Sequence, residues 1–411
     1  MAKEKVASQR KYYKTLDKIR TPIVLLNTIL GNGINFGRLV ESWGRNRSGK
    51  STLALQTASI FLDDYPDGRV VIIDSEANYS DSSRLEKVFG LSPCNGTVET
   101  LREDPRVFLY FTGVIEEAFS LTMKYVKESS ELNIPTFIVI DSLSALQPSR
   151  DVEEIEKSLG KGKLANSYSG GIALTPRVLS SSMGHLLGML PNSLSTVMVI
   201  SQVTVDMSNP YMVTEKAKGG ISKEHSLHLS VKLEIQSSSL KSKAADSSNA
   251  DLKKAANNFI DSNLHDDENI KPLTLTKLNV TKNKISVGLD DVTLMINNEK
   301  GGKFVPEYEL CESLAKGKKI IVPHGGYWSL NDELKEIYKD VDVTYIDNID
   351  KTPKVGKAGE NFIFTEIVSS DQMRDILLKE IVNYYRNNVE GIAYIYNHMD
   401  EFRKAKGLPL K

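Results

Sequence analysis

Residues 44–51 combine the residue types that bind phosphate. They read GRNRSGKS, which fits the pattern G-x-x-x-x-G-K-[ST]. The glycines of this pattern let backbone N–H groups curl around an anion, Lys50 reaches the terminal phosphates, and the hydroxyl of Ser51 is a ligand for Mg²⁺. A glycine-rich surface turn is the alternative that the pattern alone leaves open. We predict a nucleotide-binding loop whose contacts come from Gly44, Arg45, Asn46, Arg47, Ser48, Gly49, Lys50, Ser51 and Thr52.

Carboxylates follow two apolar runs of strand length. RVVIIDSEANYS begins at Arg69 and IPTFIVIDSLSAL begins at Ile134, and each run reaches the pair Asp-Ser. The second run is the better candidate for the metal-binding strand, with Asp141 in the Mg²⁺ shell, because helical sequence separates it from the phosphate loop. Glu76 lies two residues past Asp74, where a carboxylate could polarise the water that attacks the phosphate. A solvated loop acid is the alternative for Glu76 taken alone.

A third apolar run, STVMVISQ, ends in Gln202. A side-chain amide at a strand tip can sense the γ-phosphate and reposition the segment that follows. Polar loops with glycine and lysine occupy residues 151–171 and 203–224. They suggest a second, polyanionic ligand whose binding is coupled to ATP, with an ordinary solvated loop as the alternative for each. Their candidate ligand-binding residues are Lys157, Lys161, Lys163, Lys216, Lys218, Gly219 and Gly220.

Parallel strands flanked by helices are the elements that can bring these side chains together. The segment TLALQTASIFL has helical spacing and would begin at the phosphates, and the strand ends would share one edge of a sheet. TPRVLSSSMGHLLGML also has the pattern of a helix, with Pro176 suited to its first turn. The sequence therefore predicts an α/β fold with a mainly parallel, twisted sheet flanked by helices.

The composition limits the function classes. The chain has 411 residues, of which 40% are hydrophobic, enough for one large core and an appended domain. No run of about 18 apolar residues occurs and the first residues lack the apolar centre of a signal peptide, so we expect a cytoplasmic protein without membrane contact. Two cysteines, Cys94 and Cys311, suggest neither a disulfide framework nor a zinc site. The net charge of −1 leaves any affinity for nucleic acid to local basic loops.

Five motifs in order resemble those of RecA-type recombinases. NTILGNGINFGRLVESWGRNRSGKST is similar to the strand, turn and phosphate loop that open the family's core. VVIIDSEANYS, IVIDSLSAL, VMVISQV and VTKNKISVGL are similar to its other core motifs, and the match covers roughly residues 22–298. The usual bacterial N-terminal domain is absent and the tail diverges, so phage recombinases of the UvsX kind are the closer comparison. The resemblance implies a RecA-type core with bound ATP and Mg²⁺.

The resemblance assigns roles residue by residue. It implies Lys50 and Ser51 on phosphate and metal, Asp141 on the metal, Glu76 as the base that activates water, and Gln202 as the γ-phosphate sensor. In VTKNKIS, the family's two lysines correspond to Lys282 and Lys284, which would reach the neighbouring subunit's ATP site as arginine fingers do. Without the resemblance, lysines that alternate on a strand are most often a solvated face.

The resemblance also implies the partners and the reaction. The two polar loops correspond to the family's DNA-binding loops, and Arg177 to an arginine that contacts phosphate. The expected partners are single-stranded DNA, homologous duplex DNA and further copies of the chain in a helical filament. A recombination mediator and a single-strand binding protein are candidate partners. The implied activity is homologous pairing and strand exchange with DNA-stimulated hydrolysis of ATP to ADP and phosphate, in the host cytoplasm if a phage encodes the chain.

The chain departs from the family pattern in four places. In EANYSDSSR the residues that would grip the adenosine, Tyr79 and Asp81, stand in an altered register. Residues 236–270 are rich in serine, alanine, lysine and aspartate, which predicts a mobile and passive insertion in a core of residues 22–300. Residues 1–21 are the candidate polymerisation arm, with docking on the chain's own core as the alternative. Residues 301–411 are expected to form a small α+β domain.

Two other function classes use the same phosphate loop. A RecA-fold hexameric helicase or a switch ATPase would keep the loop, Asp141 and Glu76 but form closed rings. A small-molecule kinase would keep only the loop and Asp141, and it should carry a lid with several arginines. Only Arg150 and Arg177 follow in that region, and they stand apart. The sequence therefore favours a recombinase over a kinase and leaves the ring ATPase as the alternative.

Overall fold

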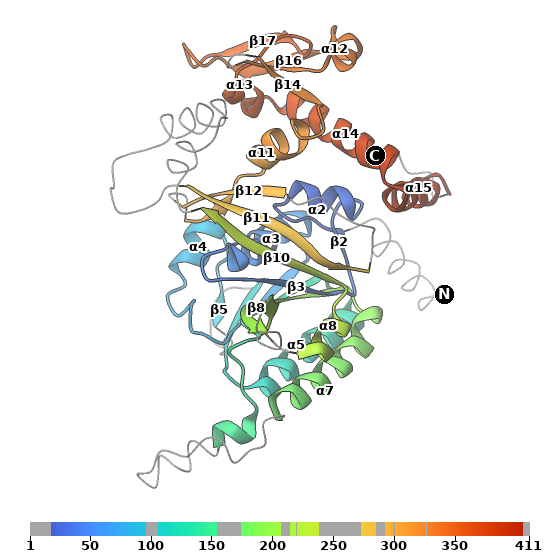
Figure 1. Ribbon diagram of the computed structural model, residues 1–411. Coiled ribbons are helices and arrows are strands. Elements are labelled where there is room, and N and C mark those ends of the chain that lie inside the picture. Colours follow the sequence, from blue (N-terminus) through green and yellow to red (C-terminus); the bar gives the residue numbers. More distant parts are fainter. Residues whose placement is uncertain are drawn as a thin grey trace. The chain divides into compact units, whose positions relative to one another are not determined.

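The computed structural model (Figure 1) describes residues 18–95, 106–153, 174–206, 214–218, 220–237, 273–284, 292–298, 301–324 and 327–405. The chain forms two compact units. The first contains the described parts of Met1–Thr21, Gly33–Leu233 and Val280–Ile285. The second contains those of Pro22–Asn32, Glu234–Asn279 and Ser286–Lys411. The domain limits expected after residues 21 and 300 stay a prediction.

The first unit is built on a mainly parallel sheet. Five neighbouring strands all run in the same direction, in the order β3 (Leu39–Gly44), β8 (Ser195–Asp206), β7 (Thr136–Asp141), β4 (Arg69–Asp74) and β6 (Val107–Phe111). Two further strands extend this parallel arrangement, β10 (Leu229–Ser237) beside β3 and β5 (Cys94–Asn95) beside β6. A short antiparallel pair, β1 (Lys18–Ile19) and β2 (Ile34–Asn35), lies apart from them. The expected α/β fold with a mainly parallel sheet is confirmed.

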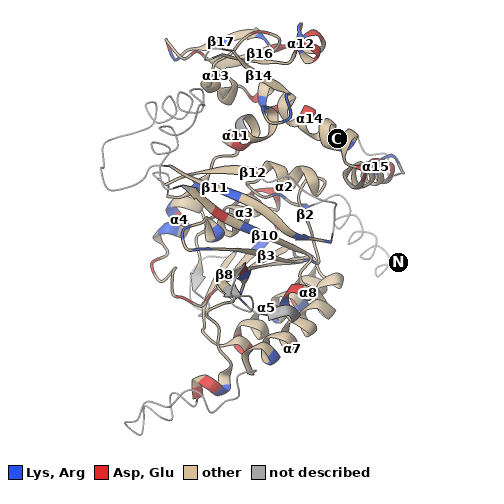
Figure 2. Ribbon diagram, viewed as in Figure 1, with Lys and Arg blue, Asp and Glu red and all other residues tan. Residues whose placement is uncertain are grey.

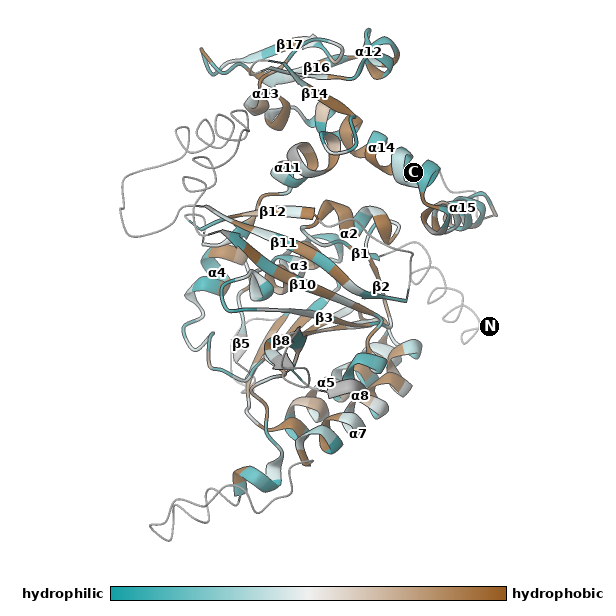
Figure 3. Cartoon of the chain, viewed as in Figure 1, coloured by the Kyte–Doolittle hydropathy of each residue, from teal (hydrophilic) through white to brown (hydrophobic). Residues whose placement is uncertain are grey.

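Helices bury the apolar strands of this sheet. The run Val70–Ile73 and the run Phe137–Ile140 are buried throughout, as expected for parallel strands covered on both faces. The covering helices are α3 (Lys50–Asp64), α4 (Ser83–Phe89), α5 (Ile115–Leu132) and α7 (Leu174–Met189), the last followed by η1 (Leu190–Asn192). One core cluster joins Phe119 of α5, Met183 of α7 and Ile140 of β7. Figure 3 shows the corresponding apolar colouring along the strands and on α5 and α7.

The segment after Gln202 differs from the expected polar loop. β8 continues past Gln202 to Asp206 and pairs antiparallel with β9 (Thr214–Ala217), so Val203 lies opposite Ala217. A short helix, α8 (Gly220–Ser226), then leads into β10. The reason is that VTVD alternates apolar and polar residues, the pattern of a strand, and finds a partner in TEKA. The described part of residues 203–224 is therefore a strand pair followed by a helix.

The second unit combines helices with short antiparallel strands. Residues 273–278 of β11 (Leu273–Asn283) pair with β12 (Val292–Asn297), which pairs with β13 (Lys303–Phe304). Two hairpins follow, β14 (Ile321–His324) with β15 (Tyr327–Leu330) and β16 (Asp342–Ile346) with β17 (Pro353–Lys357). The helices are α2 (Val24–Ile29), α11 (Pro306–Tyr308), the π-helix η2 (Glu309–Ala315), α12 (Asp332–Tyr338), α13 (Phe364–Ser369), α14 (Asp371–Asn388) and α15 (Glu390–Ala405).

Apolar side chains are buried at two places in this unit. In the β14–β15 hairpin, Trp328 is buried with its ring centroid 6.0 Å from that of Phe364. The apolar side of α14 is buried through Met373, Ile376, Leu377 and Ile381. No helix in the described ranges is long and apolar enough to cross a membrane.

A buried carboxylate holds the first turn of α2. The two oxygens of Glu309 accept the N–H groups of Val24, at 2.8 Å, and of Leu25, at 2.7 Å. These N–H groups have no partner within the helix, and a carboxylate beside them also faces the positive end of the helix dipole. Burial nevertheless raises the pKa of Glu309 to about 8. The first turn of α2 is therefore held by an acid whose charged form is disfavoured by burial.

Candidate active site

The phosphate loop occupies the turn between β3 and α3. Three of its residues have left-handed φ angles: Gly44 at 153°, Arg47 at 63° and Gly49 at 100°. A Cβ atom on Gly44 would lie only 2.1 Å from the carbonyl oxygen of Leu233 on β10, so no side chain fits there. Gly49 is the N-cap of α3, and the free N–H groups of the first helical turn therefore open onto the loop. This arrangement favours an anion at the helix N-terminus.

Lys50 lies folded over this loop. Its ammonium group donates a hydrogen bond of 2.8 Å to the carbonyl oxygen of Arg45. Burial lowers the pKa of Lys50, while the nearby carboxylates of Asp141 and Glu76 raise it. The ammonium group is therefore bonded to the loop and within electrostatic range of both acids.

Asp141 ends β7 and is buried with two hydroxyl partners. The hydroxyl of Tyr79 donates a hydrogen bond of 2.6 Å to its Oδ2 atom, and the hydroxyl of Ser51 also bonds to this carboxylate. Burial raises the pKa of Asp141, and these two hydrogen bonds act in the opposite direction. Tyr79 was expected to grip the adenosine; its hydroxyl lies against Asp141, and an adenosine contact stays a prediction.

Ser51 and Asp141 fit a Mg²⁺ ion that comes with the nucleotide. Hydroxyl and carboxylate oxygens are the ligands that Mg²⁺ takes in proteins, usually one or two of them beside substrate phosphates. Both groups are adjacent to the phosphate loop, and their oxygens already contact each other. Within the described residues, no group of three or more His, Cys, Asp and Glu side chains could hold a metal ion.

Glu76 and Gln202 are joined by a hydrogen bond. The side-chain amide of Gln202 donates to Oε1 of Glu76 at 2.9 Å, and the hydroxyl of Ser142 donates to the same oxygen at 2.5 Å. Parallel strands carry these residues to one edge of the sheet, since Glu76 follows β4 and Gln202 lies in β8. The expected base and the expected sensor are therefore neighbours of Lys50 and Asp141.

Asp74 holds the turn that carries Glu76 and Tyr79. Its Oδ1 atom accepts the N–H of Glu76 at 3.0 Å, and its Oδ2 atom accepts the N–H of Tyr79 at 2.8 Å. The side chain is buried, so these two bonds satisfy both of its oxygens. A turn-forming role was not expected for Asp74, although an acid at the end of a buried strand frequently forms a turn.

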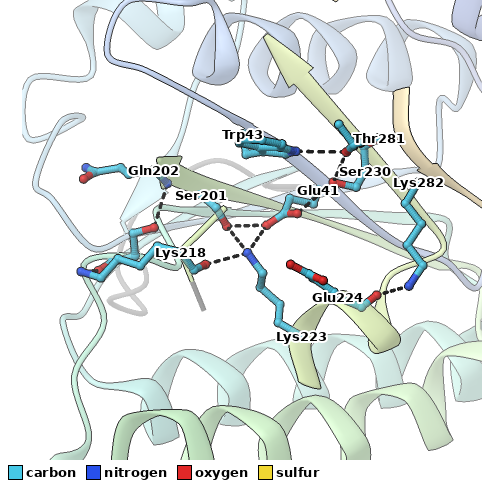
Figure 4. A network of polar contacts seen from close by, with 11 residues as sticks. Glu41, Trp43, Ser201, Gln202, Lys218, Lys223, Glu224, Ser230, Thr281 and Lys282 are labelled. Carbon is cyan, nitrogen blue, oxygen red and sulfur yellow. Dashed lines mark hydrogen bonds and ion pairs between the residues drawn. The ribbon is translucent and has the colours of Figure 1, made fainter. Parts of the chain in front are cut away.

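Figure 4 shows the hydrogen bonds that hold the neighbouring chain segments to Gln202, the expected sensor. The N–H of Gln202 donates to the hydroxyl of Ser144 at 2.8 Å, and the carbonyl of Gln202 accepts the N–H of Lys218 at 2.9 Å. The ammonium group of Lys218 donates to the carbonyl oxygen of Ser144 at 3.0 Å. The end of β9 is therefore fixed to the backbone of the sensor residue.

A buried ion pair joins α8 to β3, the strand that leads into the phosphate loop. The ammonium group of Lys223 lies 2.5 Å from Oε1 of Glu41, and the two side chains are 0% and 1% exposed. The same ammonium group donates to the carbonyl oxygen of Lys218 at 2.6 Å, and Glu41 also accepts from the hydroxyls of Ser201, at 2.6 Å, and Ser230, at 2.9 Å. We call Lys223, Glu41, Ser201 and Ser230 the Lys223 network (Figure 4).

The Lys223 network could not be found by motif. A glutamate inside the apolar run RLVESW was its one signal in the sequence, because a charge in a buried strand requires a partner.

Two ion pairs connect the phosphate loop to β9 and β10. Arg45 of the loop pairs with Glu215 of β9 at 2.6 Å, and Glu215 pairs with Lys232 of β10 at 3.0 Å. Hydrogen bonding, above all with Lys232, lowers the pKa of Glu215.

The curated proteins include relatives that match over most of the chain. Protein RecA of Mycoplasma genitalium is 27% identical over 328 residues, which are 79% of this chain and 79% of that protein. Protein RecA of Malacoplasma penetrans is 25% identical over 352 residues, 82% of this chain and 89% of that protein. The chain is therefore similar to RecA proteins over about four fifths of its length. No family model matches the chain.

Lys282 and Lys284 were expected to reach a neighbouring subunit's ATP site. In this structure both contact α8 of their own chain. Lys282, on β11, donates to the carbonyl oxygen of Glu224, and Lys284 donates to that of His225 at 2.8 Å. These are carbonyl groups of the last turn of α8, where a helix attracts cations. Burial lowers the pKa of Lys282, and the charge of Lys284 lowers it further. The role of both lysines across a seam stays a prediction.

The residues expected to bind DNA are only partly described. Lys216 lies opposite Thr204 in the β8–β9 pair, Lys218 follows β9, and Gly220 begins α8. Arg177 is exposed in the first turn of α7 and is the only Lys or Arg of that fully described helix (Figure 2). The positions outside the described residues are Lys157, Lys161, Lys163, Gly219, residues 1–17 of the arm and residues 238–270 of the insertion. Their roles stay predictions.

Proposed function

We propose that this chain is an ATP-dependent recombination protein that assembles on single-stranded DNA and catalyses homologous pairing and strand exchange. Similarity to RecA proteins supports this, and one observation in the structure carries it. Gln202, at the start of the β8–β9 segment, is bonded directly to Glu76 beside the phosphate loop. A change at the γ-phosphate can therefore reach the segment that the family uses to bind DNA.

Nucleotide binding would begin at the first turn of α3. The phosphates meet its free N–H groups, and Lys50 leaves the carbonyl of Arg45 to bind the terminal phosphates. Ser51 and Asp141 would hold Mg²⁺, which neutralises phosphate charge when it is bound.

Hydrolysis would use Glu76 as the general base. Glu76 accepts the proton of a water molecule while the water oxygen attacks the γ-phosphorus and the bond to the β-phosphate oxygen breaks. The amide of Gln202 turns from Glu76 to a γ-phosphate oxygen, which frees Oε1 for that water. Ser144 and Lys218 are bonded to the backbone of Gln202, so a backbone shift that accompanies this exchange would reach the end of β9.

Assembly would complete the site. Lys282 and Lys284 extend into the adjacent protomer's nucleotide site and stabilise the charge on the transferred phosphoryl group. A head-to-tail contact of this kind does not close on itself and produces a helical filament. DNA phosphates are then bound along the filament by Arg177, Lys216 and Lys218, together with Lys157, Lys161 and Lys163. Sequence recognition is left to base pairing.

We further propose that the chain is closer to phage recombinases than to cellular ones and acts in a host cytoplasm if a phage encodes it. A recombination mediator and a single-strand binding protein would be its partners. The hexameric helicase and the switch ATPase are not favoured by the relatives that the chain matches.

The deciding experiment combines turnover with electron microscopy. ATP hydrolysis should rise on addition of single-stranded DNA, and the protein with ATP and this DNA should form extended filaments. A Lys50→Ala variant, which lacks the phosphate-binding ammonium group, should show neither effect. Closed rings, or hydrolysis that is equally fast without DNA, would count against the proposed function.

A further inference from the structure

The carboxylate of Asp141 receives hydroxyl groups from two different parts of the chain. Ser51 comes from α3, directly after the phosphate loop, and Tyr79 comes from the turn after β4. The two hydroxyls also contact each other. Asp141 itself is only 3% exposed, so the orientation of its oxygens depends on these protein groups rather than on bulk water.

Tyr79 is fixed independently of Asp141. Its backbone N–H is bonded to Asp74, and its side chain is 1% exposed, so the ring cannot turn away without opening the core. A phenylalanine would fill the same volume. The hydroxyl is the part of the side chain that requires explanation, because burying a hydroxyl costs free energy unless it finds a partner.

Ser51 and Tyr79 differ in what they can do during nucleotide binding. The Ser51 oxygen is the group that a phosphate loop offers to Mg²⁺. The Tyr79 hydroxyl donates to Oδ2 of Asp141 at 2.6 Å, and this bond does not require Ser51. A hydrogen-bond donor behind a metal-binding carboxylate orients it, and loss of such a partner typically lowers metal affinity 10- to 100-fold.

We propose that Tyr79 is a positioning residue that holds Asp141 ready for the Mg²⁺ complex of a nucleoside triphosphate. This inference rests on the proposed ATP site and adds to it a residue that neither the phosphate-loop motif nor the expected adenosine contact assigns. The hydroxyl of Tyr79 acts through Asp141 rather than on the nucleotide. Its removal should therefore change the need for Mg²⁺ and leave the metal-free affinity for nucleotide as it is.

The test is a Tyr79→Phe variant of the full chain with a fluorescent ATP analogue. Binding is titrated with Mg²⁺ at fixed nucleotide, and separately with nucleotide in excess EDTA. The concentration of Mg²⁺ for half-maximal binding should rise about 10-fold or more, while the affinity in EDTA stays within about 2-fold of the wild type. Thermal unfolding without nucleotide checks that the variant is folded.

Tyr125→Phe is the matched control. Tyr125 is a second buried tyrosine, 4% exposed on α5, and its hydroxyl is bonded at 2.6 Å to that of Tyr110, not to a carboxylate of the site. It should lose stability as Tyr79→Phe does but keep the wild-type Mg²⁺ dependence. In an Asp141→Ala background, adding Tyr79→Phe should shift the Mg²⁺ midpoint no further, because the group that it positions is gone.

Three results would overturn the inference. An unchanged Mg²⁺ midpoint in Tyr79→Phe would show that the hydroxyl has no positioning role, with the proposed function intact. An equal loss of affinity with and without Mg²⁺ would assign Tyr79 to the nucleotide itself. A shift of the same size in the Asp141→Ala background would place its action elsewhere. A wild-type protein that binds no ATP analogue would instead refute the proposed function.

Discussion

The side-chain amide of Gln202 donates a hydrogen bond of 2.9 Å to Oε1 of Glu76. The two residues belong to β8 and to the turn after β4, with β7 between these strands. In the proposed mechanism Gln202 exchanges this bond for one to the γ-phosphate when ATP binds. The exchange removes one of the hydrogen bonds on Oε1 of Glu76 at the moment when the substrate is present.

Gln202→Ala should lower DNA-stimulated hydrolysis about 100-fold, the usual effect of removing one donor aimed at transition-state charge. The KM for ATP should change little, because the phosphate loop is untouched. Steady-state kinetics with and without single-stranded DNA checks this. Gln372→Ala, on α14 of the second unit, is the matched control. Hydrolysis that stays DNA-stimulated in Gln202→Ala would contradict the sensor role.

Lys282→Ala should bind ATP almost normally and lose about 1,000-fold or more in hydrolysis, as the loss of an arginine finger does. Mixing it with Glu76→Gln should restore part of the activity, since some seams then join an intact Lys282 to an intact Glu76. Turnover measured across mixing ratios tests this. A mixture no more active than its components would speak against a shared site.

Lys223→Met should reduce the free energy of unfolding by about 3–5 kcal/mol, because it leaves the buried carboxylate of Glu41 without its counter-charge. The double variant with Glu41→Gln should recover part of this loss. Lys127→Met, whose partner Glu131 lies 3.9 Å away on the surface, should cost less than about 1 kcal/mol. Urea denaturation measures all three, and additive losses in the double variant would argue against a coupled pair.

Glu309 should make the second unit less stable as the pH rises. Its pKa is about 8 in the folded chain, raised by burial from an ordinary 4.5, so the folded state holds a proton that the unfolded state releases. Its contribution to stability is complete below pH 4.5 and is lost as the pH rises through about 8.

Unfolding of the wild type and of Glu309→Gln should be compared at several pH values across this window. The wild type should lose stability relative to the variant with increasing pH. Glu333→Gln, at an exposed position of α12, is the control for the substitution itself. A constant difference between wild type and Glu309→Gln would refute the prediction.

Affinity for single-stranded DNA should fall steeply with salt. Each phosphate contact contributes about 0.7 to the slope of log K against log salt. Lys216→Ala should therefore reduce the slope by about that amount for all DNA sequences. Fluorescence anisotropy at several salt concentrations measures it, with Lys339→Ala on the second unit as the control. A slope unchanged by Lys216→Ala would remove this residue from the interface.

The sequence predicted the sheet and the edge where the site lies. Apolar runs that end in Asp141 and Gln202, and the run before Glu76, are strong local signals, and parallel strands necessarily bring their carboxyl ends together. The strand pair after Gln202 was missed because β9 is only four residues long and polar. Its strand character comes from pairing with β8, not from its own propensity.

The contacts that tune the site were beyond sequence reasoning. Tyr79 and Asp141 are 62 residues apart in the chain, and Lys223 and Glu41 are 182 residues apart. No periodicity or motif relates such positions. Tyr79 was noticed, but its expected partner was the adenosine, because the direction of a side chain after a turn depends on backbone bonds such as those of Asp74.

Gly44 is required for two separate reasons. A phosphate needs the bare backbone of the loop, and the carbonyl oxygen of Leu233 leaves no space for a Cβ atom even without a ligand. Evolution could therefore abandon nucleotide use in a descendant of this chain and still retain the glycine. The first glycine of the motif is therefore required by the fold as well as by phosphate binding, and its presence does not show that a protein binds nucleotide. In distant homologues, catalytic competence should be judged from the residues that correspond to Lys50 and Glu76.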